Sequence, residues 1–167
     1  MKRELAPVVM FVYNRLDSVE QTIENLKKNE LADQTDLFIF SDAAKKEKQA
    51  ESVNLVRKYI HKIVGFKSVH IIEAEKNKGL AKSVITGVTE IINKRGKVIV
   101  VEDDLITAPQ FLSFMNDALD FYEDEKKIWS ISGYQFPFEL PETYTKSVYV
   151  AYRSSSWGWA TWKDPWE

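Results

Sequence analysis

The sequence has 167 residues, with 23 basic and 25 acidic side chains, a formal net charge of −2 and no cysteine. This charge balance argues against a nucleic-acid-binding protein, which needs a basic surface, and the missing thiols exclude disulfides and thiolate metal sites. No apolar run reaches the ~20 residues that a membrane span needs, and no signal peptide is visible. We therefore expect a cytoplasmic protein with a single domain over residues 1–167.

Short apolar runs alternate with amphipathic segments along the chain. The apolar runs predict strands at 6–13, 36–40, 68–74 and 98–101, with two shorter strands at 128–132 and 148–152. Apolar residues at helical spacing predict helices that begin near residues 17, 44, 80 and 111. This alternation indicates an α/β fold with a mainly parallel open sheet and helices on both faces.

Three adjacent carboxylates, Glu102, Asp103 and Asp104, follow the buried run Val98–Val101. Such like charges repel one another unless they are well solvated or a cation sits among them. Strand alternation would send Asp103 to one side and the other two acids to the opposite side. A Mg²⁺-like ion would then take one or two protein oxygens and fill its shell with water and phosphate. Alternatively, the acids merely open a loop in which Thr107 caps the next helix.

Polar residues also follow the first two predicted strands, namely Tyr13, Asn14 and Arg15 after the first and Asp42 after the second. In a parallel sheet these positions share an edge with the acid cluster. Arg15 could fork onto a phosphate and Asp42 could accept a base N–H, as a nucleoside diphosphate requires. Each is also compatible with a surface loop, and Tyr13 with the core. The loop at Lys78 precedes a helix and could bind an anion or only cap that helix.

Four of the five tryptophans lie in the last eleven residues. Trp157, Gly158 and Trp159 favour the wall of a sugar pocket, because indole faces pack against the C–H faces of sugars. The helical spacing of Trp162 and Trp166 favours a helix face directed at the core.

With these positions identified, almost the whole chain resembles glycosyltransferases of the GT-A fold. The string VVEDDLITAPQFLSFMNDAL, preceded by VVMFVYNR and SDA, is similar to family 2 nucleotide-sugar transferases. It is more similar still to N-acetylglucosaminyltransferase I and its relatives, whose metal motif is also Glu-Asp-Asp. The later strings IWSISGY and SSSWGWATW resemble segments of the same group. The resemblance implies a Rossmann-like, nucleotide-diphospho-sugar transferase fold.

The resemblance also implies roles for individual residues. Asp104 would be the direct ligand of Mn²⁺ or Mg²⁺, while Glu102 and Asp103 would hold ribose, sugar or metal-bound water. Arg15 would meet the diphosphate, and Asp42 the uracil edge. The implied reaction is metal-dependent transfer of a sugar from a UDP-sugar to a hydroxyl of a glycan or other acceptor, with inversion.

In the enzymes that the chain resembles, the general base is an Asp or Glu downstream of the tryptophan-glycine-tryptophan segment. Nothing in the spacing of Asp164 or Glu167 marks either as that base. We therefore expect the base beyond Glu167, which would make this chain the N-terminal, donor-binding part of a longer enzyme.

Three other functions are weighed against this one. A sugar nucleotidyltransferase would carry a glycine-rich loop after the first strand, where Tyr13 to Arg15 stand. A haloacid-dehalogenase-like phosphatase would have a nucleophilic aspartate at that position. A non-catalytic nucleotide-sugar or glycan-binding module stays open as the alternative.

Overall fold

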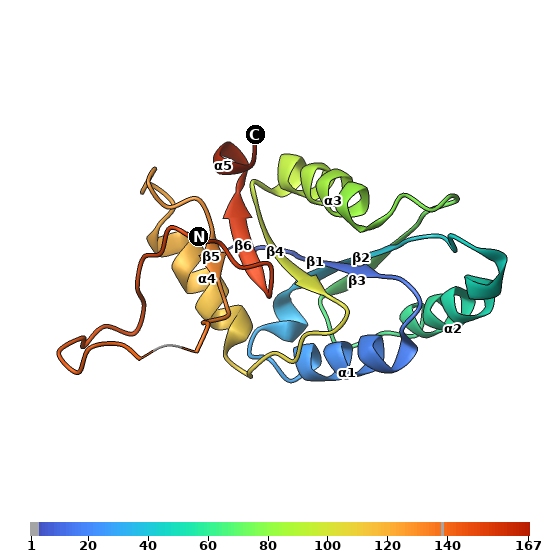
Figure 1. Cartoon of the computed structure of the whole chain (residues 1–167), viewed down its shortest axis with the longest axis horizontal. Coiled ribbons are helices and arrows are strands. Elements are labelled where there is room, and N and C mark those ends of the chain that lie inside the picture. The colour runs from blue at the N-terminus through green and yellow to red at the C-terminus, as the bar shows by residue number, and fades with distance from the viewer. Residues whose placement is uncertain (1–3, 138) are drawn as a thin grey trace.

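A six-stranded sheet forms the centre of the computed structural model, which describes residues 4–137 and 139–167 (Figure 1). The strands are β1 (Val8–Val12), β2 (Asp36–Ser41), β3 (Ser68–Glu73), β4 (Lys97–Glu102), β5 (Ile131–Ser132) and β6 (Trp159–Trp162). Their spatial order is β3-β2-β1-β4-β6-β5. Strands β1 to β4 are parallel, whereas β6 runs antiparallel to both β4 and β5. The predicted α/β fold with a mainly parallel sheet is confirmed.

Helices cover both faces of this sheet (Figure 1). On one face lie α1 (Leu16–Lys27), α2 (Ala50–Ile60) and α4 (Phe111–Phe121), and on the other lie α3 (Leu80–Arg95) and α5 (Lys163–Trp166). Two 3-10 turns, η1 (Ala32–Gln34) and η2 (Glu47–Gln49), precede β2 and α2. Because α1 and α3 lie on opposite faces, the neighbouring strands β1 and β4 flank a topological switch point, where open α/β sheets bind ligands.

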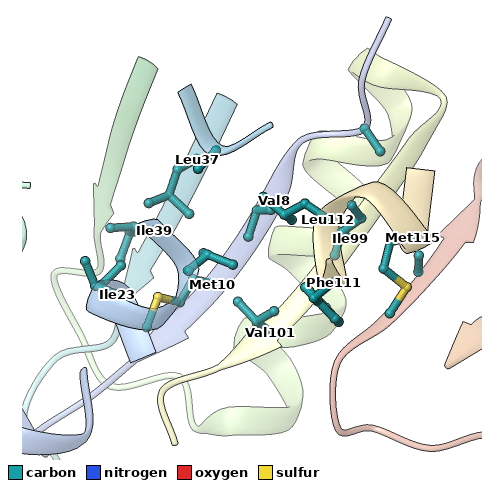
Figure 2. Packing of buried hydrophobic residues seen from close by; sticks show 14 of the residues in the cluster. Val8, Met10, Ile23, Leu37, Ile39, Ile99, Val101, Phe111, Leu112 and Met115 are labelled. Atoms are coloured by element: carbon teal, nitrogen blue, oxygen red, sulfur yellow. The ribbon is translucent and has the colours of Figure 1, made fainter. Parts of the chain in front are cut away.

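Side-chain alternation along the buried strands separates two hydrophobic clusters. On β1, Val8 and Met10 pack beneath α1, α2 and α4, whereas Val9 and Phe11 pack beneath α3. Figure 2 shows the first cluster, where Leu112 of α4 meets the residues of β1 and β4. Each buried aliphatic side chain contributes about 1.5–3 kcal/mol. Since both faces of β1 and β4 are covered, the polar groups of these strands gather at the strand ends.

Some helix boundaries differ from the sequence predictions. Helix α2 begins at Ala50 instead of near residue 44, because the 3-10 turn η2 occupies residues 47–49. Helix α4 begins after Gln110, and the Thr107 hydroxyl accepts a hydrogen bond from Asn29 instead of capping the helix. Within residues 4–137 and 139–167, no helix is both long and apolar enough to cross a bilayer. A cytoplasmic location stays a prediction of the sequence.

The strand predicted at 148–152 is wrong. This stretch lies between β5 and β6, where residues 133–137 and 139–158 form no helix or strand, and its two valines are not buried, with Val148 38% and Val150 74% exposed. The last strand is β6, which pairs with β4. Trp162 and Trp166 do turn inward, as expected, but Trp162 does so from a strand, and its indole N–H donates to the Leu119 carbonyl at 3.1 Å.

Candidate functional site

Arg15 and the acid cluster meet at the switch point. Arg15 lies between β1 and α1, and its guanidinium is 2.5 Å from Asp103 Oδ1 and 3.1 Å from Asp104 Oδ2. The predicted alternation, with Asp103 and Asp104 on opposite sides, is wrong because β4 ends at Glu102 and a turn follows. One guanidinium therefore contacts both aspartates in a single crevice.

The acid cluster carries more negative charge than Arg15 neutralises. Burial raises the pKa of Asp103, whose side chain is only 8% exposed, although the hydrogen bond from Arg15 acts in the opposite direction. Burial also raises the pKa of Glu102, and the charges of Asp104 and Asp103 add to this shift. The same hydrogen bond to Asp103 raises the pKa of Arg15. The crevice thus favours a proton or another cation among its carboxylates.

Asp104 is the carboxylate most open to an added cation, since its side chain is 43% exposed. Among the residues that the structure describes, no group of three or more His, Cys, Asp or Glu side chains is arranged to hold a metal ion. The donor set here fits an ion that takes one or two protein oxygens and completes its shell with water and phosphate.

Asp42 organises a loop at the same edge of the sheet. Its backbone N–H donates to the Val12 carbonyl of β1, which places it beside the end of that strand. Its two carboxylate oxygens accept from the Asn77 amide and from the backbone N–H groups of Lys78 and Gly79, at 2.9–3.2 Å. The carboxylate therefore takes the backbone N–H groups of the two residues that precede α3, in the loop where an external anion was one of the expected alternatives. That Asp42 accepts a hydrogen bond from the nucleotide base remains a prediction.

Tyr13 and Asn14 follow β1, and Tyr13 contacts the segment that follows β2. The Tyr13 hydroxyl donates to the Gln49 side chain at 3.0 Å and accepts from the Lys45 backbone N–H at 2.9 Å. Tyr13 thus fixes the segment that connects β2 to α2. Asn14 is half-buried, while the Lys78 side chain is exposed.

A cavity of about 420 Å³ begins at Asp104 and extends toward the C-terminal part of the chain. Trp157 and Gly158 line it, as the sugar-pocket prediction requires, together with Gly133 and Tyr134, for which the sequence indicated no role. The signal for the last two was the string IWSISGY, which ends in Gly133 and Tyr134.

Trp159 does not line this cavity, so the prediction that it forms part of the sugar-pocket wall is wrong. As the first residue of β6 it points to the α3 face of the sheet, where its ring stacks on Trp166 with centroids 5.8 Å apart. Trp166 in turn donates its indole N–H to the Thr89 hydroxyl at 2.8 Å. Trp159 is therefore a packing residue in this structure.

Comparisons with known proteins agree with this architecture. Similar solved structures include S. aureus TarS, with a TM-score of 0.52 and 16% identity over 72% of this chain and 20% of that chain. Another is the mannosyltransferase PcManGT from Pyrobaculum calidifontis in complex with GDP-Man and Mn²⁺, with a TM-score of 0.51 and 14% identity over 76% of this chain and 34% of that chain. At these identities the likeness shows the fold alone, which is the GT-A type of glycosyltransferases.

The chain thus spans about a fifth to a third of these two proteins. A search of curated protein sequences finds no match. The model of the GNT-I family, in contrast, matches residues 1–167. The expected resemblance is confirmed, and the chain belongs to the GNT-I family of glycosyltransferases.

Proposed function

We propose that this protein is a metal-dependent glycosyltransferase that moves a sugar from a UDP-sugar to an acceptor hydroxyl with inversion. The observation that carries the proposal is the contact of Arg15 with both Asp103 and Asp104 at the switch point. A guanidinium and an excess of carboxylates in one crevice suit a diphosphate that brings a divalent cation with it.

In this proposal Arg15 binds the diphosphate and stabilises its growing negative charge as the sugar leaves. Asp104 is the ligand of Mn²⁺ or Mg²⁺, and Glu102 and Asp103 hold ribose, sugar or metal-bound water. The bound ion would supply Lewis-acid stabilisation of the leaving diphosphate. Asp42, which holds the loop at Lys78, would lie beside the nucleotide base together with Tyr13 and Asn14.

The general base has no candidate at the crevice among the acids near the C-terminus. Strand β6 pairs with β4 so that Trp162 lies opposite Lys97, where β4 begins. Asp164 and Glu167, which follow β6, therefore lie at the edge of the sheet opposite to the crevice. The binding module stays the second candidate for this reason. Slow release of free sugar from a UDP-sugar with Mn²⁺ would favour the enzyme, and tight binding without turnover the module.

Isothermal titration calorimetry of UDP, with Mn²⁺ and with EDTA, tests the proposal. Wild-type protein should bind UDP more tightly with Mn²⁺, and Asp104→Ala should remove this difference, a loss of about tenfold or more in affinity. Asp33→Ala, at an exposed aspartate in η1, serves as the matched control. Metal-dependent binding that survives in Asp104→Ala would overturn the metal assignment.

A further inference from the structure

The segment that joins β5 to β6 begins and ends at two glycines that contact each other. The Gly133 N–H donates to the Gly158 carbonyl at 2.7 Å. A Cβ atom at Gly133 would lie 2.5 Å from the Phe111 ring, and Gly158 has a φ of +69°. Both positions therefore require glycine, and the segment, orange to red in Figure 1, projects from a fixed point beside α4.

Three aromatic rings gather near these glycines: Tyr134, Phe136 and Trp157, together called the aromatic cluster. The ring centroids of Tyr134 and Trp157 are 4.6 Å apart, and those of Tyr134 and Phe136 are 5.3 Å apart. The guanidinium of Arg153 lies 4.9 Å from the Phe136 centroid. Trp157 is nevertheless 49% exposed and Phe136 39% exposed. Ring faces thus remain open to a ligand after the cluster has formed.

The aromatic cluster borders the cavity that begins at Asp104. Tyr134 and Trp157 line the same cavity as Asp104, Thr107 and Phe114. Its volume of about 420 Å³ lies in the range of small-ligand sites. A molecule on the cluster would therefore reach toward the carboxylate that we assign to the metal.

The chemistry of this site selects a class of ligand. Open ring faces take the C–H face of a pyranose, while the Thr107 hydroxyl and the Asp104 carboxylate can meet its hydroxyl groups. The nearby charges, Arg153 and Asp104, are of opposite sign, which suits a neutral polyhydroxylated ring better than a polyanion.

We propose that the aromatic cluster is a carbohydrate-stacking platform that holds the acceptor sugar at the mouth of the cavity. The assignment of this sugar as acceptor rests on the proposed glycosyltransferase function, because the donor diphosphate is assigned to Arg15 and Asp104. The platform itself is defined by Tyr134, Phe136 and Trp157 alone.

Saturation-transfer NMR with methyl β-glucopyranoside and methyl α-mannopyranoside, without nucleotide or metal, tests the platform. Wild-type protein should transfer saturation to the ring protons of at least one glycoside. Phe136→Ala and Trp157→Ala should weaken this binding about 3- to 10-fold, as expected for the loss of one stacked ring. Phe136→Tyr, which keeps the ring, should restore it.

Phe121→Ala is the matched control, since Phe121 is an exposed aromatic residue at the end of α4, and glycerol is the control ligand. The platform is overturned if no glycoside binds, if glycerol is saturated equally, or if Phe121→Ala weakens binding as much as Phe136→Ala. These titrations contain neither UDP nor Mn²⁺. If no glycoside binds, the proposed diphosphate site is unaffected. If UDP binding does not depend on the metal, the proposed platform is unaffected.

Discussion

The two edges of the parallel sheet differ in how well the charges of their carboxylates are compensated. Where the strands begin, Asp36 of β2 accepts from the Ser68 hydroxyl at 2.7 Å and from Arg95 and Lys67 at 3.1 and 3.3 Å. Burial alone would raise the pKa of Asp36, but these partners outweigh burial and lower it. The negative charge of Asp36 is therefore compensated by cationic side chains of the same protein.

Where the strands end, the guanidinium of Arg15 pairs with Asp103 and Asp104, and Glu102 adds a third carboxylate beside them. Burial and mutual repulsion raise the pKa of both Glu102 and Asp103. An ion pair that only stabilises the fold needs no surplus charge, whereas a site for a cation and a diphosphate does. The comparison indicates that Asp36 supports the fold, and it supports our proposal that the acid cluster binds a ligand.

Removal of Arg15 should give the largest effect. Arg15→Ala takes away the proposed phosphate ligand, and since charge-assisted hydrogen bonds contribute about 1.5–3 kcal/mol, we expect UDP to bind about 10- to 100-fold more weakly. Calorimetry with Mn²⁺ measures this, with Lys94→Ala, an exposed cation of α3, as the control. If Arg15→Ala bound UDP as tightly as wild type, the proposal that the diphosphate binds in this crevice would be wrong.

Asp36→Asn should act on stability instead. The substitution keeps the shape of the side chain but removes the charge that Arg95 and Lys67 face. We expect the free energy of unfolding to fall by about 1–2 kcal/mol, because both cations are partly exposed and their pairing is screened. Urea denaturation measures this, and Asp33→Asn, three residues earlier and exposed, should be neutral.

The pH dependence of this loss gives a second test of Asp36. Its folded-state pKa lies below the unfolded value, so its charge stabilises the fold above the unfolded pKa. That stability disappears as the pH falls through the folded pKa. The difference between wild type and Asp36→Asn should therefore close in acid, and a difference that widens in acid would contradict the assignment.

The alternation of strands and helices and the edge that carries the site could be predicted because the responsible signals are local. The continuous run at Val98–Val101 indicates a strand buried on both faces, and parallel strands bring their ends together. That reasoning placed Arg15 and Asp104 in one crevice, where the structure puts them. The prediction that Asp103 and Asp104 point to opposite sides failed, because β4 ends at Glu102 and side chains alternate only within a strand.

The C-terminal part could not be predicted because tertiary pairing decides it. The stretches 148–152 and Trp159–Trp162 both carry apolar residues, but only the second pairs with β4. Successive side chains of β6 point to opposite faces of the sheet. Trp159, the first residue of the strand, therefore joins the α3 side, while Trp162, the fourth, joins the α4 side. The hydrogen bonds of Asp42 to Lys78 and its neighbours join two distant loops and leave no local pattern.

The smallest effect should come from Glu102→Gln, and its sign is the sharpest test of the comparison between the two edges. Glu102 is half-buried beside Asp103 and Asp104, so an uncharged side chain of the same size relieves repulsion. In EDTA at neutral pH we expect the free energy of unfolding to rise by about 0.5 kcal/mol, the scale of partly exposed charge pairs. Asp36→Asn should lower the same quantity in the same urea titration. If Glu102→Gln were also destabilising, the charge at this edge would be as well compensated as that of Asp36, and the acid cluster would have no surplus to offer a ligand.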